Sequence, residues 1–434
     1  MTSNSYQEAY VWVWLPGEIN PVVAGKLSKQ ADLLVFNYGK SYLDRDDKIS
    51  LFTPELPLQT GNISPMAGLK IASCLRDAAP DAWGRRVLIN RKFGTFKNDI
   101  DVSTLDELTY LLESGSDRIG ALDFQLSPTE FIPRQSKNPT LIELMNSAEL
   151  IEQGVPLSPE LALALQHGTA IGGARPKSLI DTDGKKFIAK FSSSTDITNI
   201  VKAEYIAMKL AALSGINVAH VELKQAGGKD VLLVERFDRV YDDKNWKRKS
   251  MVSALTLFKL DEMMARYASY EDLCEIIRHS FTHSAQTLRE LYARLCFNIL
   301  SGNTDDHARN HAAFWDGKML TLTPAYDICP QPRTGNESSQ AMLITGQERG
   351  SRLQTCLNAA PQFHLSPEEA KKIVLNLIQS ILENWDQVCS EAQISEVDKN
   401  LLRSRVFLNP YIFEGLREEN KDIQRLGYQF ADYL

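Results

Sequence analysis

The apolar residues of this 434-residue chain change their spacing once, near residue 250. Before that point, short apolar runs alternate with polar residues and turn signals, which is typical of β-strands. After it, apolar residues recur every three or four positions, which is typical of helices that bury one face. A β-rich half followed by an α-rich half, with polar motifs at the join, indicates a two-lobed α+β architecture.

The β-rich half begins with predicted strands and one capped helix. Alternation at residues 11–14 and an apolar run at 33–38 predict strands, and a helical stretch is predicted around 66–75. Asp81 is placed to cap a helix that contains Val87.

A sheet with one inserted helix is expected further along this half. Asp183-Gly184 is a strong hairpin signal between two apolar runs. The expected elements are, in order, strands at 178–182 and 186–191, a helix at 197–213, and strands at 221–225 and 231–236.

Two long helices are predicted in the α-rich half. One apolar stripe covers residues 288–300 and ends at Gly302. A second begins at Ser366, where Glu369 follows at the spacing of a capping box, and continues to Trp385.

The composition argues against several classes of protein. The chain is 43% hydrophobic and 24% charged, like an ordinary globular protein, and no apolar run reaches the roughly 18 residues that span a bilayer. Six cysteines without a CxxC pair predict reduced thiols in a cytoplasmic protein, and the first residues lack the features of a signal peptide. A net charge of -7 argues against nucleic-acid binding as the main function.

The densest polar cluster follows the 288–300 helix and contains Asp305 and Asn310. Their Asp-x-x-x-x-Asn spacing matches the catalytic loop of protein kinases. In that loop the Asp accepts the proton of the substrate hydroxyl, and the Asn binds metal. Asp306 misses this register by one position, so we assign the catalytic base to Asp305. We expect Asp306→Asn to have only a mild effect on phosphoryl transfer.

A short hairpin is predicted after Asn310, with strands at 312–315 and 319–322, and Asp327 follows it. Folding the hairpin back brings its ends together, so Asn310 and Asp327 should lie side by side. Amide and carboxylate oxygens suit a Mg²⁺ ion that phosphate oxygens also hold. A lone pair of Asp residues is usually a solvated loop feature. The kinase spacing, the hairpin and the second Asp together favour a metal and phosphoryl-transfer site.

A site for phosphates also needs a cation. Lys190 lies on a predicted strand, and Glu204 in the next helix is the expected partner that orients it. Before that sheet, residues 172–177 combine small residues, whose N–H groups can approach phosphate, with two cations. Each of these features, taken alone, is common in turns and on protein surfaces.

The segment Glu235-Arg236-Phe237 ends the last strand of the sheet, where the two halves join. A segment at that place can present backbone groups to an adenine edge, with Val234 and Phe237 lining the pocket. The alternative is a strand end with ordinary surface charges.

Together these residues resemble the HipA family of toxin kinases, and the resemblance covers nearly the whole chain. The amino-terminal part looks like the small β-rich domain that precedes the kinase core in this family, and its most recognisable piece is Asp77 to Gly84. The motifs that carry the resemblance are Gly172-Gly173-Ala174-Arg175-Pro176-Lys177, the strand that ends at Lys190, Glu235-Arg236-Phe237-Asp238-Arg239, Thr304-Asp305-x-His307-Ala308-x-Asn310 and Leu322-Thr323-Pro324-x-Tyr326-Asp327.

The resemblance implies a protein-kinase-like fold with a β-rich N-lobe, an all-α C-lobe and a small β-rich N-terminal subdomain. The implied domains are the subdomain at 1–105, the N-lobe with its phosphate loop at 106–240, and the helical C-lobe with the catalytic loop at 241–434.

The resemblance also implies ATP and Mg²⁺ as cofactors. Asp305 is the expected base, Asn310 and Asp327 are the expected metal ligands, and Glu204 is expected to orient Lys190. The residues expected to contact the nucleotide are Gly172, Gly173, Ala174, Arg175, Pro176, Lys177, Lys190, Glu235, Arg236, Phe237, His307, Ala308, Arg309, Asn310, Tyr326 and Asp327.

Family members are Ser/Thr kinases that phosphorylate proteins, among them aminoacyl-tRNA synthetases, and a small helix-turn-helix antitoxin that binds operator DNA restrains them. The resemblance therefore implies a cellular protein substrate, such as an aminoacyl-tRNA synthetase or another translation factor. It implies a HipB-like antitoxin as partner, and contact with DNA only through the antitoxin complex. No membrane partner is expected.

Two positions depart from the family pattern. Well-studied members carry an autophosphorylated Ser where this chain has Ala170, with Thr169 beside it. Self-phosphorylation in this loop is therefore expected to be absent or restricted to Thr169. Asp306 stands where Gly is common, and its carboxylate would either raise the pKa of Asp305 or point to solvent.

Two other functions fit parts of the sequence. The Asp-x-His-x-x-Asn run also resembles phosphoinositide kinases, although no basic amphipathic helix suggests a membrane surface. A catalytically idle co-repressor, acting on DNA with an antitoxin, would use the basic run at 244–249 for phosphate contacts, unless that run is a solvated loop. Such a scaffold has no need of Lys190, Asp305, Asn310 and Asp327 together.

Overall fold

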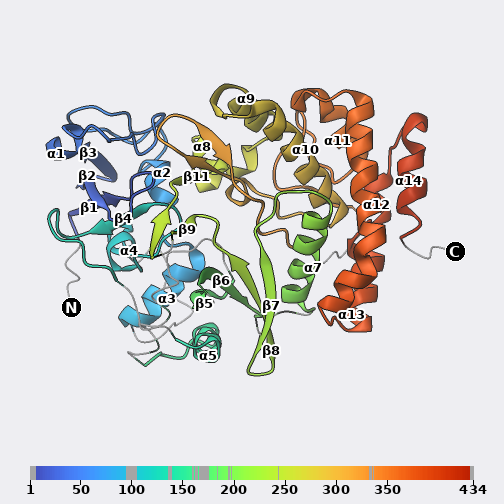
Figure 1. The fold of residues 1–434 in the computed structure, drawn as a ribbon, viewed down its shortest axis with the longest axis horizontal. Helices are drawn as coiled ribbons and strands as arrows, with labels where there is room; N and C mark the ends of the chain where they lie inside the picture. Colours follow the sequence, from blue (N-terminus) through green and yellow to red (C-terminus); the bar gives the residue numbers. More distant parts are fainter. Residues whose placement is uncertain are drawn as a thin grey trace. The chain divides into compact units, whose positions relative to one another are not determined.

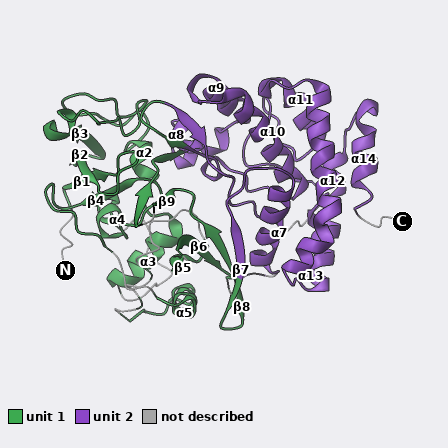
Figure 2. Ribbon diagram, in the orientation of Figure 1, with its two compact units in different colours: residues 1–195, 224–252, 314–318 green, residues 196–223, 253–313, 319–434 purple. Residues whose placement is uncertain are grey.

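The computed structural model describes residues 6–93, 105–134, 139–158, 161, 165, 175–182, 184–193, 196, 198–242, 244–331, 335 and 337–430. The chain forms two compact units, each assembled from separate stretches (Figure 2). Unit 1 comprises residues 1–195, 224–252 and 314–318, and unit 2 comprises residues 196–223, 253–313 and 319–434. Most of the strands belong to unit 1 and the longest helices to unit 2 (Figure 1). None of the described helices is both long and apolar enough to cross a bilayer.

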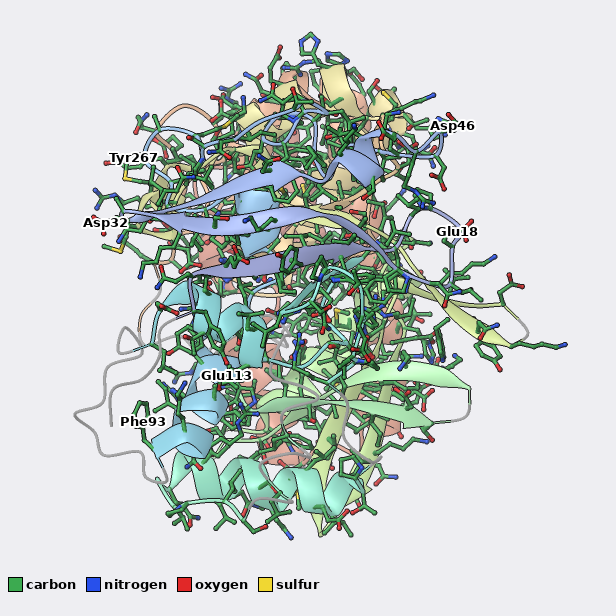
Figure 3. The ribbon with its side chains drawn as sticks, turned by 90° about the vertical axis from the view of Figure 1, so that its left-hand side faces the viewer. Glu18, Asp32, Asp46, Phe93, Glu113 and Tyr267 are labelled. Atoms are coloured by element: carbon green, nitrogen blue, oxygen red, sulfur yellow. The ribbon has the colours of Figure 1, made fainter. Side chains whose placement is uncertain are left out.

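Unit 1 begins with a four-stranded sheet of order β3-β2-β1-β4. Its strands are β1 (Glu8–Val13), β2 (Val22–Gln30), β3 (Leu33–Tyr38) and β4 (Leu122–Gln125). Figure 3 labels Asp32 at the turn between β2 and β3. Strand β1 pairs antiparallel with β2 on one side and with β4 on the other. The N-terminal sheet therefore includes a strand from beyond residue 105.

The helix predicted around residues 66–75 is wrong for most of its length, because only α2 (Ser73–Arg76) is helical. Gly68 has a φ of +86°, which an α-helix does not contain. Beside it, the Leu34 amide donates to the Lys70 carbonyl at 2.8 Å. The apolar residues of this stretch are buried in an irregular segment that runs along β3. Their spacing happens to match that of a helix.

The described part of unit 1 has four other helices, and all but α1, which follows Gly39, begin at a side chain that accepts a backbone N–H group. They are α1 (Lys40–Leu43), α3 (Ala82–Phe93), α4 (Glu107–Glu113) and α5 (Leu141–Glu152). The predicted cap at Asp81 is confirmed, since its Oδ1 accepts the Gly84 N–H at 3.2 Å. Asp106 caps α4 in the same way, and Thr140 forms a capping box with Glu143 on α5.

A second sheet of unit 1 has the order β5-β6-β8-β7. Its strands are β5 (Lys177–Thr182), β6 (Lys185–Phe191), β7 (Val221–Ala226) and β8 (Lys229–Glu235). The predicted hairpin of β5 and β6 is confirmed, and it places Lys177 opposite Lys190. Because directly opposed residues share a face, both lysines lie on one side of the sheet. On the other side, Phe187, Ala189 and Phe191 join a buried cluster that includes Trp83.

A two-stranded ribbon follows this sheet. It consists of β9 (Arg239–Asp242) and β10 (Asn245–Arg248), which pair antiparallel. The basic run at 244–249 therefore lies largely on a strand. The short strand β11 (Met251–Ser253) comes next.

Unit 2 consists mainly of helices and includes both ends of one β-hairpin, whose residues 314–318 are assigned to unit 1. The hairpin strands are β12 (Ala312–Trp315) and β13 (Leu320–Leu322), as predicted. The capping box at Ser366 is confirmed, since its hydroxyl accepts the Glu369 N–H at 3.2 Å while the Glu369 carboxylate accepts the Ser366 N–H at 2.9 Å. The helical elements are α7 (Ile200–Leu213), α8 (Ala254–Leu257), η2 (Glu262–Tyr267), α9 (Tyr270–Ser280), α10 (Ser284–Leu300), η3 (Ala308–Asn310), α11 (Leu353–Ala359), η4 (Ala360–Phe363), α12 (Pro367–Glu391), α13 (Glu396–Leu401), η5 (Leu402–Val406), η6 (Pro410–Phe413), η7 (Glu418–Asn420) and α14 (Lys421–Gly427).

The buried Arg294 ties α10 to the chain that follows β13. Its guanidinium donates to the Thr323 carbonyl at 2.9 Å, to the Asn217 carbonyl at 3.2 Å and to the Glu290 carboxylate at 3.0 Å. The Ala325 amide also donates to the Asn217 carbonyl at 2.7 Å. The segment that leads to Asp327 is therefore held on both sides by groups of unit 2.

Arg294→Ala should lower the free energy of unfolding by about 3 kcal/mol, because it leaves the buried Thr323 carbonyl without its donor and removes the charged partner of Glu290. Arg289 on the same helix is the control, since it is half exposed and lies 3.8 Å from Glu369. Arg289→Ala should change the stability by less than about 0.5 kcal/mol. Urea denaturation of the purified variants measures both values, and equal effects would contradict the anchoring role.

Candidate active site

The predicted catalytic loop follows α10 in unit 2 and is closed by its own hydrogen bonds. The His307 N–H donates to the Asp305 carbonyl and the Asn310 N–H to the His307 carbonyl, both at 2.9 Å. The Asn310 side-chain Nδ2 also donates to the Asp305 carbonyl at 3.1 Å. Because the amide is planar, this bond turns its Oδ1 to the other side, where it can meet a cation.

Asp305 is exposed, as a group that must reach a substrate hydroxyl should be. Its pKa is raised above the ordinary value, first by partial desolvation and next by the charges of Asp327 and Asp306, while His307 opposes the rise. A carboxylate with a raised pKa is a better proton acceptor than an ordinary one. The chemistry of Asp305 therefore fits a general base.

Asp306 points inward, so the alternative that it faces solvent is wrong. Its side chain is buried, it accepts a hydrogen bond from the Tyr270 hydroxyl, and its Oδ1 lies 2.8 Å from His311 Nε2. Burial would raise the pKa of Asp306, but the His311 charge and hydrogen bonds from His311 and Tyr270 lower it below its ordinary value. Asp306 thus anchors the loop while its neighbour stays exposed.

The hairpin brings the segment of Asp327 back to the catalytic loop. The Tyr326 hydroxyl donates to the Arg309 carbonyl at 2.6 Å, so the residues that precede Asp327 and Asn310 are joined directly. Asp327 has a φ of +59°, a left-handed conformation that non-glycine residues adopt rarely and often at functional sites. This arrangement supports the expectation that Asn310 and Asp327 act together.

The oxygen donors of Asn310 and Asp327 fit a hard cation that binds together with the phosphates of a nucleotide. Among the described residues, no group of three or more His, Cys, Asp or Glu side chains could hold a metal ion. An ion held by Asn310 and Asp327 would take its remaining ligands from water and phosphate oxygens, which is the usual arrangement for Mg²⁺.

In unit 1, Lys177, one of the residues predicted to contact phosphate, binds residues of the segment 77–84. The Trp83 indole Nε1 donates to the Lys177 carbonyl at 2.9 Å, and Lys177 Nζ lies 3.8 Å from Asp81 Oδ2. Lys177 is 3% exposed, so its ammonium group is directed toward Asp81 and away from bulk solvent. The most recognisable N-terminal motif therefore fixes the start of β5.

The other predicted residues of this region divide into three groups. The Pro176 carbonyl accepts the Phe191 N–H at 3.0 Å, which places Arg175 and Pro176 at the entry to β5. Lys190 lies on β6 in unit 1, Glu204 is buried on α7 in unit 2, and their pairing stays a prediction. Thr169, Ala170, Gly172, Gly173 and Ala174 lie outside the described residues.

The predicted adenine segment lies in the connector, which we define as residues 235–238 between β8 and β9. Glu235 pairs with Lys185 at 2.7 Å, and Phe237 packs edge-on against Phe314. The Arg236 side chain is buried in bonds to Asp117 and Asp238. The Arg236 backbone N–H donates to the Lys186 carbonyl, so a nucleotide contact by Arg236 would come from its backbone carbonyl. Asp117 was not predicted, because nothing in its local sequence marks a partner 119 positions away.

The basic run at 244–249 is largely engaged within unit 1. Lys247 pairs with Asp242, and Lys249 Nζ lies 4.7 Å from the centre of the Phe314 ring. The Arg248 guanidinium lies 3.4 Å from the centre of the Trp14 ring and donates to the Ser116 carbonyl at 3.0 Å. The run therefore lies largely on a strand and not in a loop, and its Lys244 and Lys249 are exposed.

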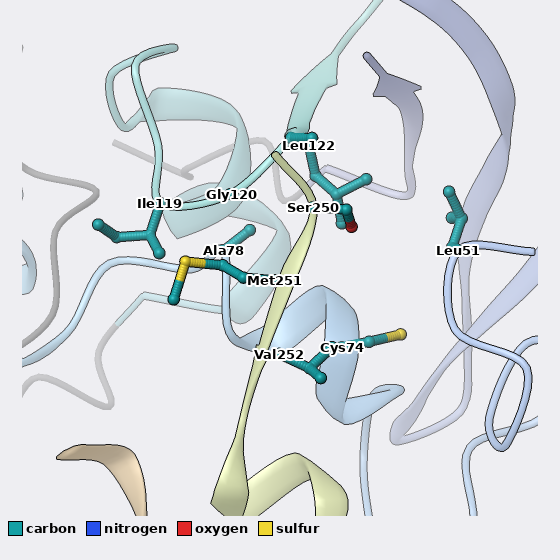
Figure 4. A pocket seen from close by; sticks show the side chains of 10 residues that line it. Leu51, Cys74, Ala78, Ile119, Gly120, Leu122, Ser250, Met251 and Val252 are labelled. Atoms are coloured by element: carbon teal, nitrogen blue, oxygen red, sulfur yellow. The ribbon is translucent and has the colours of Figure 1, made fainter. Parts of the chain in front are cut away.

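Unit 1 contains a small pocket, and most of the residues that line it are apolar (Figure 4). None of the residues that line it is a predicted site residue. They are Leu51, Cys74, Ala78, Ile119, Gly120, Ala121, Leu122, Ser250, Met251 and Val252.

Two family models match this chain. The model described as the HipA-like C-terminal domain matches residues 169–385, which is half of the chain. The model described as the HipA N-terminal domain matches residues 13–125.

Curated relatives are similar at low identity. A putative kinase Y4mE of Sinorhizobium fredii is 26% identical over 249 residues, which cover 53% of this chain and 59% of that protein. The Serine/threonine-protein kinase toxin HipA of Shewanella oneidensis is 24% identical over 340 residues, which cover 71% of this chain and 73% of that protein. The match therefore spans less than two thirds of the first relative.

A solved structure shares the fold. A chain in the complex of HipA, HipB and operator DNA from Shewanella oneidensis MR-1 superposes with a TM-score of 0.64 at 18% identity. The match covers 97% of this chain and 95% of that chain. It confirms the expected α+β, kinase-like fold.

Asp306→Ala should lower the free energy of unfolding by about 3–5 kcal/mol, because it leaves Tyr270 and His311 buried without their acceptor. The effect of Asp306→Asn on phosphoryl transfer, which is expected from the sequence to be mild, stays a prediction. The exposed neighbour provides the control, since Asp305→Ala should change the stability by less than about 1 kcal/mol. Urea denaturation compares the two variants, and a more damaging Asp305→Ala would contradict the assignment of roles.

Proposed function

Since this chain belongs to the HipA family, we propose that it is an ATP- and Mg²⁺-dependent protein Ser/Thr kinase of the HipA toxin type. The observation that carries the proposal is the closed loop in which Asp305 stays exposed while Asn310 is fixed by the Asp305 carbonyl. Relatives named as kinases support it.

In the proposed reaction, Asp305 accepts the proton of a substrate Ser or Thr hydroxyl. At the same time, the oxygen of that hydroxyl bonds to the γ-phosphorus of ATP. The bond from the γ-phosphorus to the bridging oxygen breaks, and ADP is the leaving group. Asn310 and Asp327 would hold the metal ion. Mg²⁺, when bound, offsets the negative charge of the phosphate oxygens. Asp306 and Tyr326 keep the loop in the geometry that this transfer needs.

The remaining predicted residues would bind the nucleotide. Lys190 would contact the phosphates, with Glu204 as its orienting partner, and residues 172–177 would form the phosphate loop. The backbone at Glu235, Arg236 and Phe237 would meet the adenine. The other residues that would line the nucleotide site are His307, Ala308, Arg309 and Tyr326.

The substrate is proposed to be a cellular protein, with aminoacyl-tRNA synthetases and other translation factors as the first class to test. A HipB-like helix-turn-helix antitoxin is the proposed partner. The structural relative from Shewanella oneidensis was solved together with HipB and operator DNA, which supports this proposal. DNA contact would be indirect, through the antitoxin complex.

The alternative of an idle co-repressor depends on the basic run for its phosphate contacts. Lys247, Arg248 and Lys249 of the basic run are engaged with Asp242, Trp14 and Phe314. We therefore favour the kinase.

Asp305→Asn should lower phosphoryl transfer by at least about a hundredfold, because a general base acts in the chemical step. The affinity for Mg-ATP should change less than about threefold, because the base contributes little to ground-state binding. Transfer from labelled ATP to proteins of a bacterial extract, together with calorimetry, measures both. Asp316→Asn, in the exposed hairpin turn, is the control and should retain full activity. Normal transfer by Asp305→Asn would overturn the assignment.

Asp327→Ala should weaken Mg-ATP binding by about tenfold or more, because the ion loses its carboxylate ligand. Binding of ATP in excess EDTA should be the same for wild type and variant. Isothermal titration calorimetry under both conditions isolates the contribution of the metal. Unchanged affinity for Mg-ATP would exclude Asp327 as a ligand.

A further inference from the structure

A buried ion network in unit 1 joins residues 117–120 to the connector. Arg236 donates to Asp117 Oδ1 at 3.0 Å and to the two Asp238 oxygens at 3.0 and 2.8 Å. Arg239 donates to Asp117 Oδ1 at 2.7 Å and to Asp238 Oδ2 at 2.9 Å. All four side chains are almost completely buried. Two carboxylates and two guanidinium groups therefore stabilise one another without water.

The same arginines also bind the backbone of residues 117–120. Arg236 donates to the Arg118 carbonyl at 2.7 Å, and Arg239 donates to the Gly120 carbonyl at 2.9 Å. In the opposite direction, the Gly120 N–H donates to Asp238 Oδ2 at 2.7 Å. Because backbone groups of one segment bond to side chains of the other, neither segment can shift without breaking several bonds.

Asp117 lies at the centre of this network. It accepts hydrogen bonds from both arginines through Oδ1, and its Oδ2 lies 3.1 Å from Lys186 Nζ. Burial would raise the pKa of Asp117, but Arg236 and Arg239 hold it well below its ordinary value. The carboxylate is therefore ionised in the folded protein. Without it, the single negative charge of Asp238 has to offset two buried guanidinium groups.

The network couples the N-terminal sheet to the connector. Two residues after Gly120 the chain enters β4, which pairs with β1. At the other end, the Arg236 N–H donates to the Lys186 carbonyl at 2.8 Å on β6. The connector is thus fixed between the sheet that carries Lys190 and the segment that follows α4. Asp117 takes no part in the proposed phosphoryl transfer, and its contacts all serve to hold the connector and β6 in place.

We propose that Asp117 is a positioning residue for the adenine: it fixes the connector backbone and so sets the affinity for the adenosine part of the nucleotide. This inference rests on the proposed kinase function. Backbone groups recognise an adenine edge well only when they are held in place before binding. If the segment is disordered, ordering it on binding costs conformational entropy and weakens the affinity. The phosphates would be bound by Lys190 and the metal ligands, which lie outside the connector.

Asp117→Asn tests the proposal, because it keeps the size of the side chain and removes the charge. Calorimetry should show adenosine binding weakened by about tenfold, with Mg-tripolyphosphate binding changed less than about twofold. A general loss of structure would weaken both ligands equally. Hydrogen exchange without ligand should be faster at residues 235–239 of the variant. If Asp117→Asn does not fold, Asp117→Glu, which displaces the charge by one methylene, should show the same split.

Two matched controls separate positioning from stability. Asp123→Asn loses buried pairs with Arg118 and Arg134, and should lower the melting temperature without changing the affinity for adenosine. Asp181→Asn loses its contact with Lys186 and should also bind adenosine normally. Equal weakening by Asp123→Asn and Asp117→Asn would overturn the positioning role.

The outcomes also distinguish this inference from the proposed function. If the wild type binds adenosine and Mg-ATP, and Asp117→Asn binds adenosine equally well, only the positioning role is wrong. If the wild type binds neither ligand, the kinase proposal is wrong and the role in adenine binding falls with it.

Discussion

The burial of the Arg236 guanidinium is the constraint on which unit 1 depends. A buried charge is stable only with charged partners and satisfied hydrogen bonds, and Asp117 and Asp238 supply both. Arg236 and Asp117 are 119 positions apart, so this requirement joins the end of β8 to the chain that leads into β4. The segment 77–84 adds a second link, since Trp83 binds the Lys177 carbonyl. The N-terminal domain is therefore an integral part of unit 1.

In unit 2, buried polar groups that hydrogen-bond to one another likewise hold the predicted catalytic loop. Asp306 is buried against Tyr270 and His311, and this holds the loop while leaving Asp305 exposed. Arg294 and Tyr326 fix the segment that carries Asp327. Two adjacent carboxylates thus differ completely in environment, and only the exposed one has a raised pKa that suits a base.

Local patterns in the sequence predicted much of this structure. The hairpin at Asp183-Gly184 and the capping box at Ser366 were correct, because turns and caps depend on a few neighbouring residues. The helix at 66–75 failed, because apolar spacing cannot reveal that Gly68 is left-handed and that the segment pairs with β3.

Sequence patterns also failed to predict the contacts at the candidate site that join residues far apart in the chain. The kinase spacing predicts roles for Asp305 and Asn310, but it does not reveal the burial of Asp306 against Tyr270, 36 positions earlier. The Asp117–Arg236 pair is more distant still. Such pairs leave no trace in local spacing, so only the folded chain reveals them.

The most direct test is a crystal structure of the protein with Mg²⁺ and a non-hydrolysable ATP analogue. The account predicts an adenine bonded to the backbone of the connector, Arg236 still bound to Asp117, and a metal ion within about 2.1 Å of oxygens of Asn310 and Asp327. A nucleotide bound elsewhere, or Arg236 released from Asp117 to bind phosphate, would contradict it.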